Sequence, residues 1–299
     1  MKLIEVAELI EIRWHGRGGQ GAVTSAELLA LAAINEGKFS QAFPSFGPER
    51  RGAPVLAFNR ISGQAHIRVR SAVTQPDIVV VLDPGLLGIS DVTSGLKHGG
   101  ALVINSPREL EEIKSKFGGP WRLAVVNATA IALELLKVPI VNTTMMGALV
   151  KASDVVRLDS LAELMKERFG KLAQRNIAAC KRAYDETSVA EPSPISRKAE
   201  KAHVVESLPS WRELTPGFVV TEPGNSRSYR TGDWRAERPV SNHDRCIKCG
   251  ICSLFCPEDC ISQDGEGYFE ADLYYCKGCG ICARECWTGA ITMVEEAKE

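Results

Sequence analysis

The sequence predicts an α/β fold in which a doubly wound, mainly parallel sheet domain precedes a small α+β domain. Aliphatic runs of strand length alternate with helical patterns over residues 10–186, as in domains whose parallel sheet is covered by helices. Nine of the ten cysteines lie in the last sixty residues, and six of the fifteen prolines lie between these two parts. We therefore expect domains at 1–186 and 240–299, joined by a proline-rich arm at 187–239.

The first domain is expected to open with a strand, a glycine-rich turn and a helix. A β-prone run at Ile10–Trp14 ends in the turn His15–Gly21, and a helical pattern follows over Ala22–Asn35. The turn matches G-x-G-x-x-G, a spacing whose backbone amides can bind a phosphate at a helix N-terminus. The candidate cofactor-binding residues of this turn are Gly16, Arg17, Gly18, Gly19, Gln20 and Gly21.

A nicotinamide site at this turn fails one check. Such a site needs an acidic residue about 20 positions further on, at the end of the second strand, and the chain has Phe39–Pro44 there, which we expect to be a loop. Two other interpretations stay open. The glycines can serve a tight turn packed under the helix, or the turn can approach a cofactor or substrate that a partner chain holds.

The stretch from Gln41 to Pro54 is expected to be a long loop. It contains three prolines, two phenylalanines and the pair Arg50–Arg51. Loops of this length inside a compact domain are usually functional or disordered, and the aromatic residues argue against disorder. Arg50 and Arg51 are therefore candidate cofactor-binding residues, with a solvated charged turn as the alternative.

The remaining elements of the first domain follow from hydrophobic patterning. The aliphatic run Asp77–Leu82 is typical of a central parallel strand. Further strands are expected at Pro54–Phe58, Ala65–Val69, Ala101–Ile104 and Leu123–Val126, and helices at 108–117, 129–137, 144–152 and 159–186. Cys180, on the last helix, is expected to be a small buried hydrophobic residue. The proline-rich arm also carries aromatic residues, so we expect it to pack along its own surface or a partner's.

The cysteine-rich end contains the ligand run of a bacterial-type ferredoxin twice. The eight candidate metal ligands are Cys246, Cys249, Cys252 and Cys256, then Cys276, Cys279, Cys282 and Cys286. In two-cluster domains the fourth cysteine of each run binds the other cluster. We therefore expect one [4Fe–4S] cluster on the first three cysteines plus Cys286, and a second on Cys276, Cys279, Cys282 and Cys256. The spacing disfavours structural zinc, which uses paired CxxC knuckles rather than triple runs. Disulfides are also disfavoured, because they are typical of secreted chains.

Composition excludes several classes of function. The formal net charge is −1, without the basic stripe of a nucleic-acid-binding protein. Apolar runs fall short of the ~18 residues of a membrane span, and residues 1–12 mix charges with aliphatics, unlike a signal peptide. We expect a cytoplasmic protein in a reducing, low-oxygen setting, with neither nucleic acid nor membrane as a partner.

Both halves carry motifs of one known family, and the chain resembles the 2-oxoacid:ferredoxin oxidoreductases. The γ-type motifs are Ile12–Gly21, Ala42–Pro44 and Glu49–Pro54, and the δ-type motif is Thr231–Arg235 with Arg238–Val240, leading into the cysteines. The combination resembles a γ and a δ subunit fused in one chain. Two departures are Trp287, where the family usually has proline, and the extra Cys260, which we expect to be a buried or free thiol.

The resemblance implies an electron-transfer and scaffold subunit that is not catalytic alone. Thiamine diphosphate and Mg²⁺ are expected in partner α- and β-type subunits, which form a dimer of heterotrimers with this chain, and ferredoxin is expected as the electron acceptor. Most members make an acyl-CoA from pyruvate and coenzyme A, whereas a related member with fused γ and δ parts oxidises oxalate without coenzyme A. The rival functions are a free-standing flavin or nicotinamide oxidoreductase with its own ferredoxin domain, and an assembly protein with structural clusters.

 The five histidines are scattered, and we expect His15, His66, His98 and His203 to be structural; His243 lies near Cys246 and is expected to be solvent-exposed or to tune a cluster by hydrogen bonding.

Overall fold

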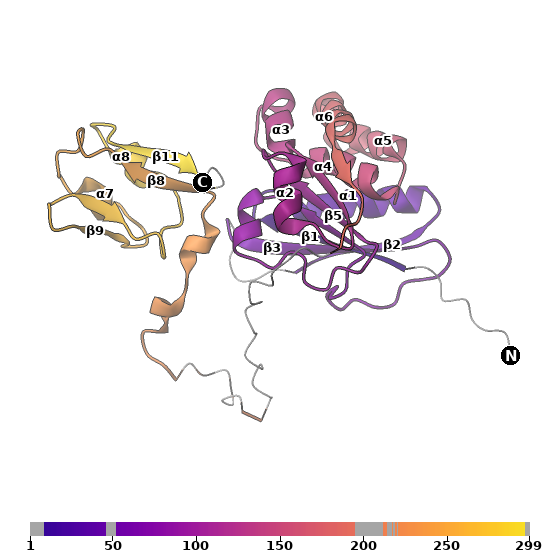
Figure 1. Ribbon diagram of the computed structural model, residues 1–299, viewed down its shortest axis with the longest axis horizontal. Coiled ribbons are helices and arrows are strands. Elements are labelled where there is room, and N and C mark those ends of the chain that lie inside the picture. The colour runs from indigo at the N-terminus through magenta and orange to yellow at the C-terminus, as the bar shows by residue number, and fades with distance from the viewer. Residues whose placement is uncertain are drawn as a thin grey trace. The chain divides into compact units, whose positions relative to one another are not determined.

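The computed structural model describes residues 9–45, 52–194, 212–213, 217, 219 and 221–296 (Figure 1). The chain divides into two compact units, Met1–Ser196 and Arg197–Glu299. The two units do not share a sheet, and each has its own cluster of buried residues.

The first unit is built on a seven-stranded sheet in the order β2-β3-β1-β4-β5-β6-β7. Strands β1, β4, β5 and β6 are parallel, while β3 pairs antiparallel with β1 and β2, and β7 pairs antiparallel with β6. The centre of the sheet is therefore parallel, as expected. The strands are β1 Leu9–Arg17, β2 Phe39–Ser45, β3 Pro54–Ser62, β4 Ile78–Val81, β5 Ala101–Asn105, β6 Arg122–Val126 and β7 Ser188–Ala190.

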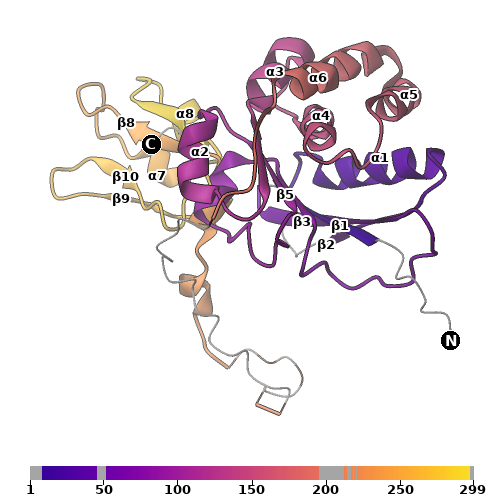
Figure 2. The ribbon, with the colours of Figure 1, turned by 45° about the vertical axis from the view of Figure 1, so that its right-hand side comes forward.

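Helices cover both faces of this sheet (Figure 2). Alternate residues of β4 show the division: Val80 packs in the core with α1, α3, α4, α5 and α6, whereas Val79 and Val81 pack in the core with α2. A strand buried on both faces needs an aliphatic side chain at every position, which explains the run Ile78–Val81. The helices are α1 Ala22–Asn35, α2 Leu110–Phe117, α3 Ala128–Leu136, α4 Asn142–Ser153, α5 Leu158–Phe169 and α6 Ala173–Glu186.

Two of the expected elements beside the sheet are wrong, and the expected Gln41–Pro54 loop is shorter, because β2 extends to Ser45. Phe39–Pro44 is not a loop, because β2 spans Phe39–Ser45 and pairs with β3 at the edge of the sheet, where Pro44 is tolerated. The expected strand Ala65–Val69 is irregular, and side chains rather than a strand ladder bind its carbonyls: Gln41 Nε2 donates to Ile67 at 2.6 Å.

The expected helix 159–186 is two helices. Gly170 has φ 48° and ψ −116°, outside the helical region, so α5 ends at Phe169 and α6 begins at Ala173 after one 3₁₀ turn. Cys180 is buried at 2% exposure as expected, and burial raises the pKa of its thiol to about 12.

The start of the expected arm belongs to the first unit. Strand β7, Ser188–Ala190, lies within residues 187–239 and completes the sheet beside β6.

The second unit consists of two short strand pairs and two short helices. Strand β8 pairs antiparallel with β11, and β9 with β10. The cysteine runs cross from one pair to the other through the helices, so each run is anchored at both ends. The elements are β8 Glu237–Ser241, α7 Ile251–Leu254, β9 Ile261–Gln263, β10 Phe269–Ala271, α8 Ile281–Glu285 and β11 Ile291–Glu295.

Candidate functional site

The first three cysteines of the first run share a pocket with the last cysteine of the second run. Cys246, Cys249, Cys252 and Cys286 all line this pocket, together with Ile251, Phe269, Ala290 and Ile291 among others. We call it pocket A. The four thiols thus lie on one cavity although forty residues separate the first from the last.

The complementary set lines a second cavity, pocket B. Its lining contains Cys276, Cys279 and Cys282 of the second run and Cys256 of the first, with Cys260, Pro239 and Met293 among the other residues. The fourth cysteine of each run therefore lies on the pocket of the other run. This is the arrangement that the crossed assignment of ligands requires.

The two cysteine loops adopt the same backbone conformation at equivalent positions. Lys248 and Gly278, each two residues after the first cysteine of a run, have φ of 60° and 65°. Gly250 and Gly280 precede the two helices with φ of 75° and 77°. The left-handed region favours glycine. At Gly278 the backbone is also crowded, since a Cβ would lie 2.0 Å from the carbonyl oxygen of Glu237.

Four cysteine side chains on each pocket are the ligand set that a [4Fe–4S] cluster takes. Burial raises the pKa of the Cys286 thiol, but hydrogen bonds outweigh burial, so that its pKa is lowered overall. The Thr288 hydroxyl shares a hydrogen bond with Sγ at 3.5 Å, and the Ala290 amide donates to Sγ at 3.3 Å. Hydrogen bonds to the sulfur of this kind tune an iron–sulfur centre. Within the described residues, His, Cys, Asp and Glu side chains form no group of three that could hold a metal ion; the thiols are spaced around the pockets instead.

The two departures noted in the cysteine runs differ in their surroundings. Cys260 is buried at 7% exposure, and its Sγ lies 3.6 Å from Sγ of Cys256. Desolvation by burial raises the pKa of its thiol, as does the hydrogen bond with Cys256. Trp287 is 74% exposed and is not among the residues that line either pocket. Its ring therefore points to solvent rather than covering a pocket.

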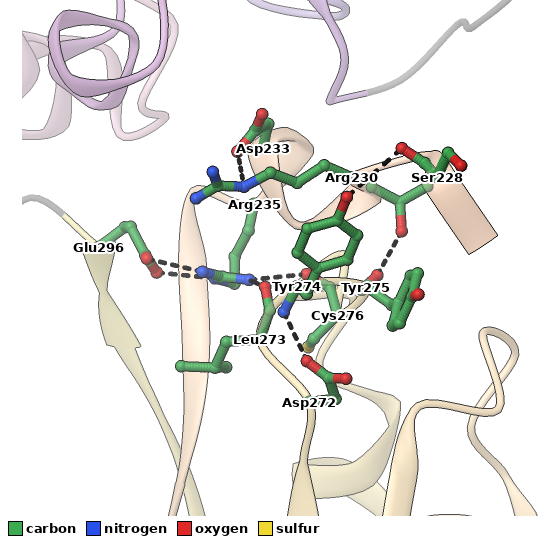
Figure 3. Close-up of polar contacts among 11 residues, drawn as sticks. Ser228, Arg230, Asp233, Arg235, Asp272, Leu273, Tyr274, Tyr275, Cys276 and Glu296 are labelled. Atoms are coloured by element: carbon green, nitrogen blue, oxygen red, sulfur yellow. Dashed lines mark hydrogen bonds and ion pairs between the residues drawn. The ribbon is translucent and has the colours of Figure 1, made fainter. Parts of the chain in front are cut away.

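The end of the proline-rich arm is fixed against the loop that carries Cys276 (Figure 3). The amide of Gly232 donates to the carbonyl of Tyr274 at 2.8 Å, and a Cβ on Gly232 would lie 2.1 Å from the carbonyl oxygen of Leu273. On the other side, the Tyr275 hydroxyl donates to the carbonyl of Arg227 at 2.8 Å. The end of the arm, from Arg227 to Arg235, thus packs on the second unit of its own chain, as one of the two expected alternatives had it, whereas Ser188–Ala190 pairs with β6 of the first unit.

Arg235 is the main polar anchor of this arm. Its guanidinium donates to both carboxylate oxygens of Glu296 at 2.8 Å and to the carbonyls of Leu273 and Cys276 at 2.7 and 3.0 Å (Figure 3). The Glu296 carboxylate raises the pKa of Arg235, against the opposing effect of burial. Arg235 was part of the quoted motif, but its spacing from Glu296 gave no signal that these residues pair.

The glycine turn lies at the carboxyl end of β1, next to the carboxyl end of β4. Arg17 is 3% exposed, and its Nε lies 3.3 Å from Oδ2 of Asp83, while its Nη1 donates to the carbonyl of Gly52 at 3.1 Å. Gln20 accepts from the Arg17 amide at 2.8 Å and donates to Asp83. Arg17 and Gln20 therefore hold the turn to Asp83, a residue that sequence reasoning did not single out for this role.

Other backbone groups of the turn are also engaged within the protein. The Gly18 amide donates to the Ala53 carbonyl at 2.9 Å, and the Gln20 amide donates to the Arg17 carbonyl at 3.0 Å. Gly21, with φ 82°, has Asn142 of α4 so close that a Cβ would meet it at 2.7 Å. These contacts account for the glycines through a tight turn and close packing. Arg50 and Arg51 lie outside the described residues.

The histidines have different environments. His15 is buried, and its Nε2 accepts from Arg13 Nε at 3.0 Å. Desolvation by burial, then the charge of Arg13, lowers its pKa to about 3. His243 is exposed, stacks on Tyr268 at a centroid distance of 3.9 Å and lies 2.7 Å from Glu270; His203 lies outside the described residues. We find a structural role for His15, as expected.

Residues 239–262 match the 4Fe-4S binding domain, so the second unit is a ferredoxin-type iron–sulfur domain. Residues 11–186, more than half of the chain, match the family described as pyruvate ferredoxin/flavodoxin oxidoreductase. The chain belongs to this family.

Three similar proteins each match about three fifths of the chain. The chain is 52% identical over 185 residues to the pyruvate/ketoisovalerate oxidoreductases common subunit gamma of Thermococcus kodakarensis, which covers 61% of this chain and 100% of the relative. It is 51% identical over 179 residues to the pyruvate synthase subunit PorC of Methanothermobacter thermautotrophicus, covering 60% and 96%. The crystal structure of the pyruvate oxidoreductase subunit PORC of Thermotoga maritima matches with 40% identity and a TM-score of 0.55, covering 62% and 99%.

These relatives match over nearly their whole length, and about two fifths of the chain lies outside each match. Across the described ranges, the helices all fall short of the length and apolar character that a membrane span requires.

Proposed function

We propose that this chain is the electron-transfer and scaffold subunit, a fusion of γ- and δ-type parts, of a thiamine diphosphate-dependent 2-oxoacid:ferredoxin oxidoreductase. The family match over residues 11–186 supports the γ-type part, and the 4Fe-4S domain match supports the δ-type part. The relatives are named as gamma or PorC subunits of pyruvate oxidoreductases, which favours the same position in a complex for this chain.

One observation carries the proposal: a γ-type domain shares its chain with two pockets, each lined by four cysteines in the crossed pattern. We propose one [4Fe–4S] cluster in each pocket. When bound, such a cluster accepts and releases one electron at a time. The chain supplies the thiols, excludes water through residues such as Phe269 and Met293 that line the pockets, and tunes Cys286 through its hydrogen-bond donors.

The crossed ligation can be tested with one substitution. Cys286→Ala is expected to lower the signal of the cluster in pocket A, whose other three ligands are Cys246, Cys249 and Cys252. The signal of the cluster in pocket B should be unchanged. Electron paramagnetic resonance of the reduced, anaerobically purified protein measures this. Loss confined to the cluster of the second run would show that each run binds its own cluster.

The partners and substrate follow from the same proposal. We propose that α- and β-type subunits carry thiamine diphosphate and Mg²⁺, in a dimer of heterotrimers, and that ferredoxin accepts the electrons. The names of the relatives favour pyruvate as the substrate. We propose coenzyme A as its co-substrate, and oxalate without coenzyme A is the alternative substrate, because the resemblance includes an oxalate-oxidising member with fused γ and δ parts. A native pull-down assayed with pyruvate, 2-oxoglutarate and oxalate, with and without coenzyme A, tests this. A protein that arrives without partner chains and reduces ferredoxin with none of these acids would contradict the proposal.

We also propose that the glycine turn and the Arg50–Arg51 loop face a partner subunit. The turn lies at the carboxyl end of β1, the edge where ligands gather in open α/β sheets, and Gly52 beside the loop contacts Arg17 and Gly18. If the loop reaches a substrate or coenzyme A, Arg50→Ala leaves the complex assembled but raises the substrate requirement or lowers turnover. If it serves the interface, the complex dissociates and activity falls in proportion. Unchanged assembly with unchanged kinetics would remove both roles.

A further inference from the structure

The second unit contains a thiol beyond the two sets of four. Cys260 lines pocket B together with Cys256, Cys276, Cys279 and Cys282. Its Sγ lies 3.6 Å from Sγ of Cys256, a separation of the size that a change between staggered side-chain rotamers can close. A fifth sulfur therefore stands beside the position of the fourth ligand of pocket B.

The other half of the unit offers an internal comparison. Ala290 follows Cys286 by four residues, as Cys260 follows Cys256, and it lines pocket A. The preceding residues, Asp259 and Gly289, share a left-handed backbone with φ of 48° and 59°. The two positions are thus equivalent in conformation and in their placement on a pocket. One carries a thiol and the other a methyl group.

The Ala290 position is also in direct contact with the ligand of its own half. The Ala290 amide donates to Sγ of Cys286 at 3.3 Å, so a side chain on this residue starts close to the ligand sulfur. In the described residues that line pocket A, the cysteines are Cys246, Cys249, Cys252 and Cys286. A spare thiol is therefore a property of pocket B and not of pocket A.

We propose that Cys260 is a reserve ligand, which binds the iron of pocket B that Cys256 would bind when Cys256 is replaced. In this exchange Cys260 Sγ releases its proton to solvent and forms the iron–sulfur bond; nothing is oxidised or reduced. In the unaltered chain Cys256 keeps the position, because its spacing from Cys252 is the spacing of Cys286 from Cys282, and Cys260 remains a thiol. The inference rests on the proposed cluster in pocket B.

The two halves provide matched variants for the test. Cys256→Ala and Cys286→Ala remove the equivalent ligand from the two pockets, and Cys256→Ala with Cys260→Ala removes the reserve thiol as well. The full-length chain is purified anaerobically with its partners, and iron and sulfide are counted per chain, with electron paramagnetic resonance on the oxidised and reduced protein. The wild type with two [4Fe–4S] clusters holds about eight irons.

Cys256→Ala is expected to keep the wild-type iron content, with pocket B still a four-iron cluster. Cys286→Ala and the double variant are each expected to lose iron from one pocket, seen as a half-empty protein or as the oxidised-state signal of a three-iron cluster. Adding Ala290→Cys to Cys286→Ala should restore the lost iron, because it gives pocket A the thiol that pocket B has. The intact cluster of the other pocket reports in each variant that the unit has folded.

Two outcomes would overturn the inference. If Cys256→Ala loses as much iron as Cys286→Ala, Cys260 does not replace the ligand. If the double variant keeps as much iron as Cys256→Ala, another ligand than Cys260 fills the position. The failure of the proposed function looks different, since the wild type itself would then lack the iron of pocket B.

Discussion

Replacing Arg235 with methionine is expected to release the clusters faster. The guanidinium joins the arm to the end of β11 through Glu296, and to the loop of Cys276 through two backbone carbonyls. Methionine keeps much of the apolar stem but removes all four hydrogen bonds. The loop that carries a proposed ligand of pocket B then loses its polar attachment on one side.

The magnitude follows from how well these groups are shielded from water. The side chains of Arg235 and Glu296 are 9% and 30% exposed. Breaking a buried charged pair costs about 3–5 kcal/mol, and the lower end applies because Glu296 can be rehydrated. At about 1.4 kcal/mol for each factor of ten, a loss of about 3 kcal/mol corresponds to a roughly hundredfold faster opening when the bonds are absent from the transition state.

The assay is the anaerobic transfer of iron to a chelator, followed by the loss of cluster absorbance. Arg230→Met is the matched control, because Arg230 lies in the same arm and its ion pair with Asp233 at 2.9 Å is exposed at 63% and 32%. Such a pair contributes about 0–1 kcal/mol, so the control should release iron less than about fivefold faster. Equal rates for both variants would show that Arg235 does not hold the cluster loop.

Three further predictions concern the two units separately. The pKa of His15 is about 3 in the folded protein and about 6.5 in the unfolded chain, so the stabilisation that neutral His15 gives is present above pH 6.5 and is lost as the pH falls toward 3. Between pH 7.5 and pH 5 the wild type should lose about 2 kcal/mol of unfolding free energy for this reason. Urea unfolding of His15→Gln should lack this pH-dependent loss. Gly147→Ala should lower the stability by at least ~1–3 kcal/mol, since a Cβ would lie 1.9 Å from the Cys180 carbonyl oxygen, while Gly63→Ala, with open space around it, should be near neutral in the same assay. Redox titration should place both proposed clusters on the order of −400 mV, and positive midpoints for both would rule out ferredoxin as the acceptor.

Local patterns predicted the central elements of the first unit well. The helix Ala22–Asn35 has the expected bounds, because a left-handed Gly21 starts it and alanine-rich faces bury it. The strand around Ile78–Val81 was evident, since burial on both faces leaves an unbroken aliphatic run. The edge strands were missed for the opposite reason: β2 and β7 are partly exposed and follow from pairing with neighbours rather than from their own composition.

The cysteine spacing carried the candidate site further than any other signal. Ligand spacing in the two runs led to the crossed sets, and the structure places each set on one pocket. The ion pairs Arg17–Asp83 and Arg235–Glu296 could not be foreseen, because each joins residues more than sixty positions apart. The sequence therefore indicated which residues could bind a cluster, but not which residues hold those ligands in place.

The measurement that tests the central claim most directly is the redox state of this chain during turnover. The native complex, purified anaerobically, is mixed with pyruvate and coenzyme A, or with oxalate, and frozen for electron paramagnetic resonance, with iron counted on the same sample. We predict about eight irons in this chain, and signals of both reduced clusters that appear with the 2-oxoacid and vanish when ferredoxin is added. Clusters that stay oxidised while the complex consumes its 2-oxoacid and reduces ferredoxin would contradict the proposed function.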